Sequence, residues 1–216
     1  MSPADASKAG LSAAEALRRL VAGNERFVRG EGLSPLLRGQ ALADHVEGQH
    51  PFATILGCSD SRVPPELIFD AGLGELFIIR VAGNIISPEI HGTIQYAGTY
   101  LQTPLFVVLG HEGCGAVKAA LEAKFHGAKK RERVQMLLQS ILPGLTELES
   151  ALPPEQMLVH AVEANVRWSM QQILETPEAQ ARLAEENYRL VGAVYELRTG
   201  RVRILDPEGP RTRRSD

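Results

Sequence analysis

The sequence predicts an α/β domain with a mainly parallel central sheet, flanking helices and one antiparallel edge strand. Short apolar runs without strict polar–apolar alternation recur along the chain, as in strands that are buried on both faces. Segments with helical spacing separate these runs, an order typical of parallel sheets. The runs lie at residues 51–57, 75–82, 104–110 and 190–197.

The chain begins with a predicted amphipathic helix over residues 11–29. Apolar side chains recur there at helical spacing, and Ser12 followed by Glu15 is typical of a helix N-cap. We expect this helix to belong to an N-terminal helical arm, about residues 10–46, of a single domain that spans residues 1–216.

The later helices are indicated by their caps. Ser87-Pro88-Glu89 opens a helix that reaches about Leu101, and Thr176-Pro177-Glu178 opens another. Serine and threonine cap helices, and proline is tolerated in the first turn. Further helices are predicted over residues 114–125, 130–150 and 153–174. Residues 200–205 follow a turn and predict a last strand, antiparallel to its neighbour at the sheet edge.

Composition limits the function. The 216 residues are 44% hydrophobic, enough for one substantial core, and the formal net charge is −3. Such a chain has no overall basic field, so nucleic acid is not an expected partner. Neither a signal peptide nor a membrane-spanning apolar run is apparent, so the cytoplasm is the expected location and no membrane partner is expected.

The only two cysteines follow predicted strands. Cys58 comes after the run 51–57, whereas His111 and Cys114 come after the run 104–110. Ligands of open α/β sheets bind beyond the carboxyl ends of the strands. If these two strands are neighbours, two thiolates and one imidazole meet, a set that suits zinc with a fourth position open. Cys114 also opens a predicted helix, where a thiolate is favoured.

Two other interpretations of these residues remain open at this point. The cysteines can be small buried apolar side chains without a ligand. The glycines of the segment Gly110 to Gly115, between a strand and a helix, can instead cradle a phosphate.

Three longer segments of the sequence resemble those of a known protein family. The segments CSDSRVPPELIFDAGLGELFIIRVAGN, GHEGCGAV and LVGAVYELRTGRVRIL resemble the β-class carbonic anhydrases, over roughly residues 10–206. The resemblance implies reversible hydration of carbon dioxide to bicarbonate and a proton by zinc-bound hydroxide. One zinc ion (Zn2+) per subunit is implied as the cofactor.

The resemblance also assigns residues. It implies Cys58, His111 and Cys114 as metal ligands, and Asp60 with Arg62 as the catalytic pair. It implies further residues around the substrate: Gln49, Phe77, Ala82, Tyr96 and Gly115. In this family the glutamine comes from the partner subunit, so a homodimer or a dimer of dimers is implied.

Charge explains why Asp60 and Arg62 are needed. Two thiolates cancel the charge of zinc, so the metal should acidify its water less than an all-histidine site would. Asp60 can accept a hydrogen bond from the hydroxide, while Arg62 holds the carboxylate through a bidentate pair. An unrestrained Asp60 would itself become the fourth ligand, in a closed inactive form. An ordinary surface ion pair, worth under about 1 kcal/mol, is the alternative.

We expect Asp60 to be off the metal at pH 7.5. Some family members carry a tryptophan three residues before the first cysteine, which helps to form an inhibitory bicarbonate pocket. This chain has Ile55 there, although the matching arginine, Arg80, is present. A second departure from the family pattern is Val81, which replaces the commoner asparagine.

Rival functions share part of this site. A carbonyl sulfide or carbon disulfide hydrolase would use the same fold and ligands, and a non-enzymatic zinc or bicarbonate-sensing protein would need the metal alone. The other histidines have no paired ligand spacing, so we expect them to be surface or structural residues: His45, His50, His91, His126 and His160.

Overall fold

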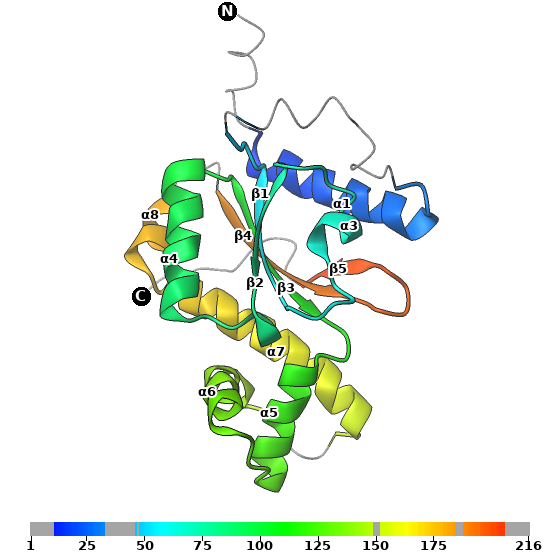
Figure 1. The fold of residues 1–216 in the computed structure, drawn as a ribbon, viewed down its shortest axis with the longest axis vertical. Helices are drawn as coiled ribbons and strands as arrows, with labels where there is room; N and C mark the ends of the chain where they lie inside the picture. The colour runs from blue at the N-terminus through cyan, green and yellow to red at the C-terminus, as the bar shows by residue number, and fades with distance from the viewer. Residues whose placement is uncertain (1–10, 33–45, 47, 149–151, 185–187, 206–216) are drawn as a thin grey trace, which may run out of the picture.

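The computed structural model describes residues 11–32, 46, 48–148, 152–184 and 188–205 (Figure 1). Its α-helices are α1 (Ala13–Arg29), α3 (Pro65–Ile68), α4 (Pro88–Tyr96), α5 (Gly115–His126), α6 (Glu132–Ile141), α7 (Pro154–Leu174) and α8 (Pro177–Leu183). Its strands are β1 (Ala53–Gly57), β2 (Leu76–Arg80), β3 (Leu105–His111), β4 (Arg189–Tyr195) and β5 (Val202–Ile204).

The strands form one sheet in the order β2-β1-β3-β4-β5. The first four are parallel, and β5 pairs antiparallel with β4 at the edge. The predicted α/β architecture is therefore confirmed. Because β1 and β3 are direct neighbours, the loops that follow them start at the same edge of the sheet.

Helix α1 begins where its sequence predicts. The Ser12 hydroxyl accepts a hydrogen bond from the Glu15 amide, and the Glu15 carboxylate accepts one from the Ser12 amide. The helix ends at Gly30, whose φ of 69° suits a residue without a Cβ. The rest of the expected arm, from 33 to 45 and at 47, lies outside the described residues and includes His45.

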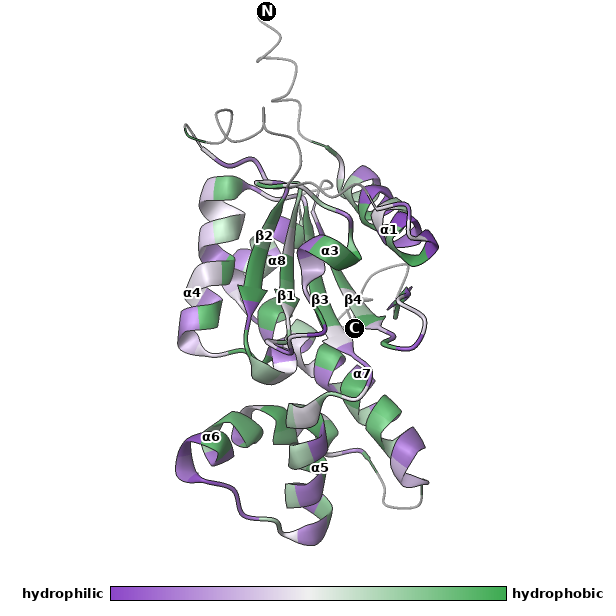
Figure 2. Cartoon of the chain, turned by 45° about the vertical axis from the view of Figure 1, so that its right-hand side comes forward, coloured by the Kyte–Doolittle hydropathy of each residue, from purple (hydrophilic) through white to green (hydrophobic). Residues whose placement is uncertain are grey.

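Two layers of helices cover the sheet. Leu105, Val107 and Leu109 of β3 belong to a core cluster that also contains Leu20 of α1. The alternate residues Phe106 and Val108 belong to the second cluster, with apolar side chains of α5, α6 and α7. Hydrophobic colouring concentrates on the strands, whereas the helices carry their polar faces outward (Figure 2). Both faces of β3 are thus buried, as its uninterrupted apolar sequence predicts.

Two predicted helices change their helical type before they end. The helix from Ser87 becomes a π-helical turn, η3 (Ala97–Leu101), after Tyr96, and Gln102 follows in the left-handed region with φ 52°. The helix expected over 130–150 ends at Ile141 and continues as a short 3-10 turn, η4 (Leu142–Leu145). Pro143 lies in this turn and supplies no amide to extend the α-helical ladder.

The periodicity of the sequence did not predict two short elements. One is α3, and another is the 3-10 turn η2 (Ala82–Asn84), which follows β2. A segment of three or four residues is too short to show a helical period. Among the described residues, no helix combines the length and apolar character that crossing a membrane requires.

Candidate metal centre and active site

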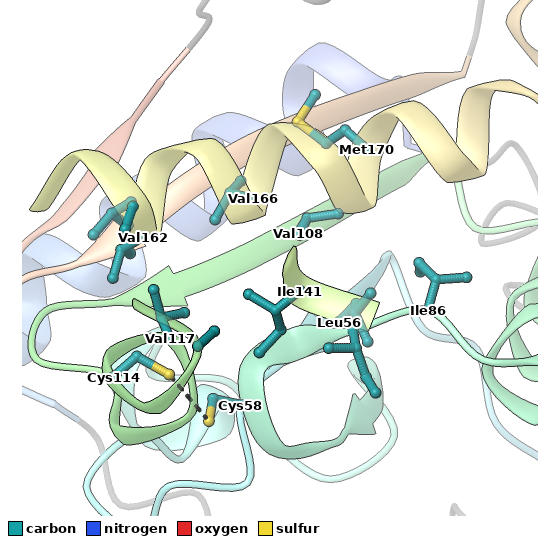
Figure 3. Close-up of a cluster of buried hydrophobic side chains, with 14 of the residues drawn as sticks. Leu56, Cys58, Ile86, Val108, Cys114, Val117, Ile141, Val162, Val166 and Met170 are labelled. Carbon is teal, nitrogen blue, oxygen red and sulfur yellow. Dashed lines mark hydrogen bonds between the residues drawn. The ribbon is translucent and has the colours of Figure 1, made fainter. Parts of the chain in front are cut away.

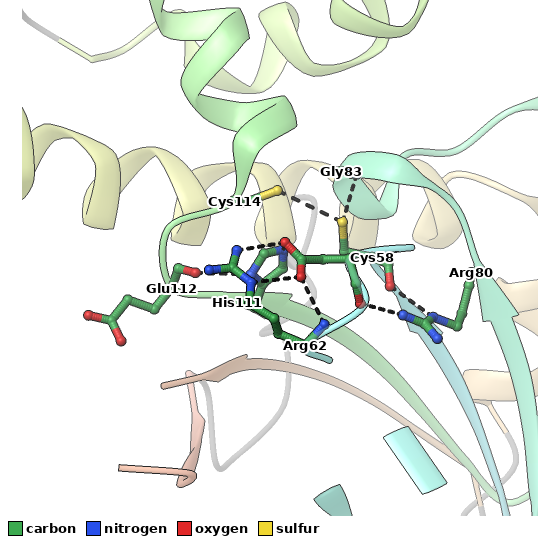
Figure 4. A network of polar contacts seen from close by, with 8 residues as sticks. Cys58, Arg62, Arg80, Gly83, His111, Glu112 and Cys114 are labelled. Atoms are coloured by element: carbon green, nitrogen blue, oxygen red, sulfur yellow. Dashed lines mark hydrogen bonds and ion pairs between the residues drawn. The ribbon is translucent and has the colours of Figure 1, made fainter. Parts of the chain in front are cut away.

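The two loops that carry the cysteines converge at one edge of the sheet. Gly57 of β1 is in register with Leu109 of β3, so Cys58 emerges close to His111 (Figure 4). Cys58, His111 and Cys114 are all buried, and their candidate ligand atoms lie within 4.8 Å of one another. The expected convergence of these three side chains is what the parallel pairing of β1 with β3 produces.

His111 presents one nitrogen to this group. Its Nδ1 lies 2.9 Å from the carbonyl oxygen of Glu112, which suits a protonated Nδ1 that donates. Its Nε2 is buried and has no hydrogen-bond partner among the described residues. A metal ligand requires such a free nitrogen, because the bond of the other nitrogen fixes the tautomer.

The two thiols lie against each other, with their Sγ atoms 4.0 Å apart (Figure 3). A hydrogen bond from the Cys114 thiol lowers the pKa of Cys58 to about 4, against the effect of burial. The same hydrogen bond, together with burial, raises the pKa of Cys114 far above its usual value. A metal binds cysteines as thiolates, so a bound metal would displace the protons of both thiols. Cys114 is the N-cap residue of α5, as expected.

Asp60 is held by Arg62 through three hydrogen bonds. Arg62 Nε and Nη2 donate to the two carboxylate oxygens at 2.9 and 2.7 Å, and the Arg62 backbone amide donates at 3.0 Å. This pairing holds the pKa of Asp60 well below its usual range and raises the pKa of Arg62. Asp60 Oδ2 is 3.9 Å from His111 Nε2. The carboxylate therefore borders the candidate metal group while it faces Arg62.

Arg80 holds the same loop from β2. Its Nε donates to the carbonyl oxygen of Cys58 at 3.0 Å, and its Nη2 donates to that of Asp60 at 2.6 Å. The guanidinium of Arg80 is thus occupied by two backbone carbonyls. This role was not apparent from the sequence, because 22 residues separate Arg80 from Cys58 and only the pairing of β1 with β2 joins them.

Of the expected pocket residues, Ala82 and Gly115 lie near the metal group, whereas Phe77 is in register with Thr54, four residues before Cys58. Phe77 of β2 and Tyr96 of α4 have ring centroids 6.0 Å apart, and Tyr96 is 46% exposed. Ala82 opens the turn η2, and Gly115 is the first residue of α5. The exposed start of α5 leaves a backbone amide accessible at this edge, whereas the role of the ring pair as a pocket wall stays a prediction.

Gln49 lies elsewhere in the chain. It is exposed and precedes β1, whereas Cys58 follows the other end of that strand. Five extended residues span roughly 16 Å, so the described chain does not bring Gln49 to its own cysteines. The expectation that the partner subunit supplies this glutamine stays a prediction.

Comparison with known proteins identifies the family. Residues 53–202 match the sequence profile of the family described as carbonic anhydrase. The chain belongs to the β-carbonic anhydrase family. Its members are enzymes, and its activity is the reversible hydration of carbon dioxide to bicarbonate.

Individual relatives agree with this family. "Carbonic anhydrase 2" of Mycobacterium tuberculosis is 40% identical over 199 residues, which cover 90% of this chain and 93% of the relative. A "Carbonic anhydrase" of Mycolicibacterium smegmatis is 38% identical over 88% of this chain and 91% of its own length. The crystal structure of the β-carbonic anhydrase CafA of Aspergillus fumigatus shares the fold, with a TM-score of 0.74 at 24% identity over 90% of this chain and 92% of that one.

Proposed function

We propose that this carbonic anhydrase uses a zinc ion held by Cys58, His111 and Cys114, with Asp60 and Arg62 as its catalytic pair. The observation that carries the proposal is the buried group of two sulfurs and one unpartnered imidazole nitrogen, all within 4.8 Å. Zinc accepts this donor set, with Zn–S bonds of about 2.3 Å and Zn–N bonds of about 2.0 Å, and leaves a fourth position open.

The metal would supply a hydroxide nucleophile at neutral pH, because zinc lowers the pKa of coordinated water. The protein must then orient that nucleophile. Asp60 is suited to accept its hydrogen bond, which directs a lone pair toward the substrate carbon. Arg62 keeps the carboxylate ionised and turned away from the metal, as the bidentate pair supports.

We expect the substrate side of the site to be apolar, because the substrate is an uncharged linear molecule. Phe77, Ala82 and Tyr96 form the proposed wall. The Gly115 amide at the start of α5, and Gln49 of a second copy, would donate hydrogen bonds to the oxygens that gain negative charge.

We also propose a homodimer or a dimer of dimers in the cytoplasm. In the described sheet β2 is an edge strand, and the apolar Phe77, Tyr96 and Tyr100 lie on or beside it. An apolar edge of this kind is usually covered. Two free cysteines that act as ligands fit a reducing compartment.

Stopped-flow hydration of carbon dioxide, measured against pH on protein of determined zinc content, tests the proposal. We expect one zinc per subunit and hydration activity. Cys58→Ser and His111→Ala should lose zinc and activity together, and full zinc occupancy in either variant would contradict the ligand set. A sulfide-release assay on the same sample addresses the hydrolase alternative. Zinc-loaded protein without hydration would favour a sensing role.

A further inference from the structure

The turn η2 contacts the proposed metal group through its backbone. The Gly83 amide donates a hydrogen bond to Cys58 Sγ, with N and S 3.3 Å apart (Figure 4). A hydrogen bond to a ligand sulfur draws electron density from it and changes how strongly the sulfur binds and polarises a metal. The position of this amide therefore matters to the chemistry of Cys58.

The conformation of η2 requires support from outside the turn. Gly83 has φ 73° and Asn84 has φ 44°, a region that residues with side chains rarely adopt. A Cβ at Gly83 would lie 2.9 Å from Ile141 Cδ1, so the turn is also packed closely against α6. Three residues cannot hold this geometry by their own backbone preferences.

Helix α7 supplies the support through two polar side chains. Asn165 Nδ2 donates to the Gly83 carbonyl oxygen at 2.8 Å, and Ser169 Oγ donates to the Asn84 carbonyl oxygen at 2.9 Å. The two residues are four apart and so share one face of the helix. The two turn residues with positive φ are therefore each held by a hydrogen bond that their own carbonyl oxygen accepts from α7.

These side chains lie in an apolar core. Asn165 is 1% exposed and Ser169 is fully buried. Val162 and Val166 of the same helix point toward β3, and Met170 points toward β4 (Figure 3). Asn165 Oδ1 and Asn84 Nδ2 are buried without a hydrogen-bond partner among the described residues. Polar groups at such positions destabilise a core, so packing alone does not account for them.

We propose that Asn165 and Ser169 are positioning residues that hold the Gly83 amide on the Cys58 sulfur and thereby tune the bond from this sulfur to the metal. The inference rests on the proposed metal site. The hydrogen bonds of both side chains go to the turn and not to the sulfur, so they act through Gly83.

The first test uses metal-free protein and follows hydrogen exchange of the Gly83 amide by NMR. We expect Asn165→Leu and Ser169→Ala to speed this exchange about tenfold or more, because the turn loses its anchor. The matched control is Asn24→Leu. Asn24 is also buried, and its Nδ2 donates to the carbonyls of Ile68 and Gly200, away from η2. The Asn24→Leu substitution should leave the exchange rate of the Gly83 amide unchanged.

The second test uses the loaded protein. In cobalt(II)-substituted Asn165→Leu, the sulfur-to-cobalt charge-transfer band should move to longer wavelength, since the sulfur loses its hydrogen bond. Zinc should pass to a chelator about 10-fold faster or more. Ser169→Thr keeps the hydroxyl and should restore values close to those of the wild type, whereas Ser169→Ala should not.

Unchanged Gly83 exchange in folded Asn165→Leu and Ser169→Ala would overturn the proposal, as would equal changes in Asn24→Leu. If Asn165→Leu does not fold, the smaller Ser169→Ala decides. Wild-type protein that takes up neither zinc nor cobalt would refute the metal site, and the exchange measurement would still decide whether α7 positions the amide.

Discussion

Asp60 borders two groups that compete for its carboxylate, the guanidinium of Arg62 and the buried ligand group. Two hydrogen bonds from the Arg62 guanidinium hold the carboxylate in this structure, and its side chain is only 18% exposed. Arg80 fixes the loop beneath it through two backbone carbonyls. The carboxylate is therefore ionised and oriented before any substrate arrives, as a group that aligns a nucleophile must be.

Asp60→Asn tests this role. We expect zinc content to stay at the wild-type level while turnover falls about 10- to 100-fold, because an amide cannot replace the charged acceptor. Stopped-flow hydration per bound zinc measures the change. Asp70→Asn is the matched control: Asp70 is paired with Arg26 at 2.6 Å, away from the site. Unimpaired hydration by Asp60→Asn would remove Asp60 from the mechanism.

Among the elements, α7 connects distant parts of the chain. Its apolar face packs on β3 and β4, its polar residues Asn165 and Ser169 hold η2, and Glu163 reaches the edge strand β5. Glu163 accepts hydrogen bonds from Arg203 at 2.6 Å and from Arg167 at 3.3 Å. Burial is the largest single effect and raises the pKa of Glu163, but the hydrogen bonds and charges of Arg203 and Arg167 together outweigh it and lower that pKa.

The hydrogen bond from Arg203 to Glu163 predicts a pH-dependent contribution to the stability of the fold. The folded-state pKa of Glu163 is lowered, so the stabilisation is present above the unfolded value of about 4.3 and is lost as the pH falls through the folded value. Glu163→Gln should reduce the free energy of unfolding by up to about 1 kcal/mol at pH 7, since Arg203 is half-exposed. Urea unfolding at pH 7 and pH 3 measures this difference, and an equal loss at both values would contradict the assignment.

In the described chain as a whole, Gln49 lies far from the candidate metal group. The proposed ligands and the proposed catalytic pair lie at the carboxyl edge of the sheet, whereas Gln49 lies beyond the opposite end of β1. A symmetric dimer can bring the glutamine of one copy to the metal site of the other, because two-fold symmetry makes each contact occur twice, once in each direction. Activity would then require two chains per site.

Mixing two impaired variants distinguishes a Gln49 that acts across the dimer interface from a Gln49 that acts within its own chain. Gln49→Ala and Asp60→Asn each damage every site of their own dimers. If Gln49 acts across the interface, random subunit exchange should restore about a quarter of the wild-type sites, since each mixed dimer has one intact site. If Gln49 acts within its own chain, the mixed dimer has none, and hydration after exchange would stay at the sum of the two variants.

The sequence by itself determined the fold class, the strands and which three side chains form the candidate metal group. These features are local: apolar runs mark buried strands, and caps mark helices. Cys58, His111 and Cys114 lie at or just after the ends of β1 and β3, which share one edge because the two strands pair. Helix ends were less predictable, since the π-helical turn after Tyr96 has no sequence signal of its own.

Only the tertiary structure decided how the site is supported. Arg80 reaches the carbonyls of Cys58 and Asp60 across β1 and β2, and Asn165 reaches Gly83 over 82 residues of chain. In the sequence Asn165 and Ser169 are two polar residues on a helix, with nothing to say whether they face water or the core. Packing against the sheet buries them, and burial is what makes a hydrogen bond to a strained turn obligatory.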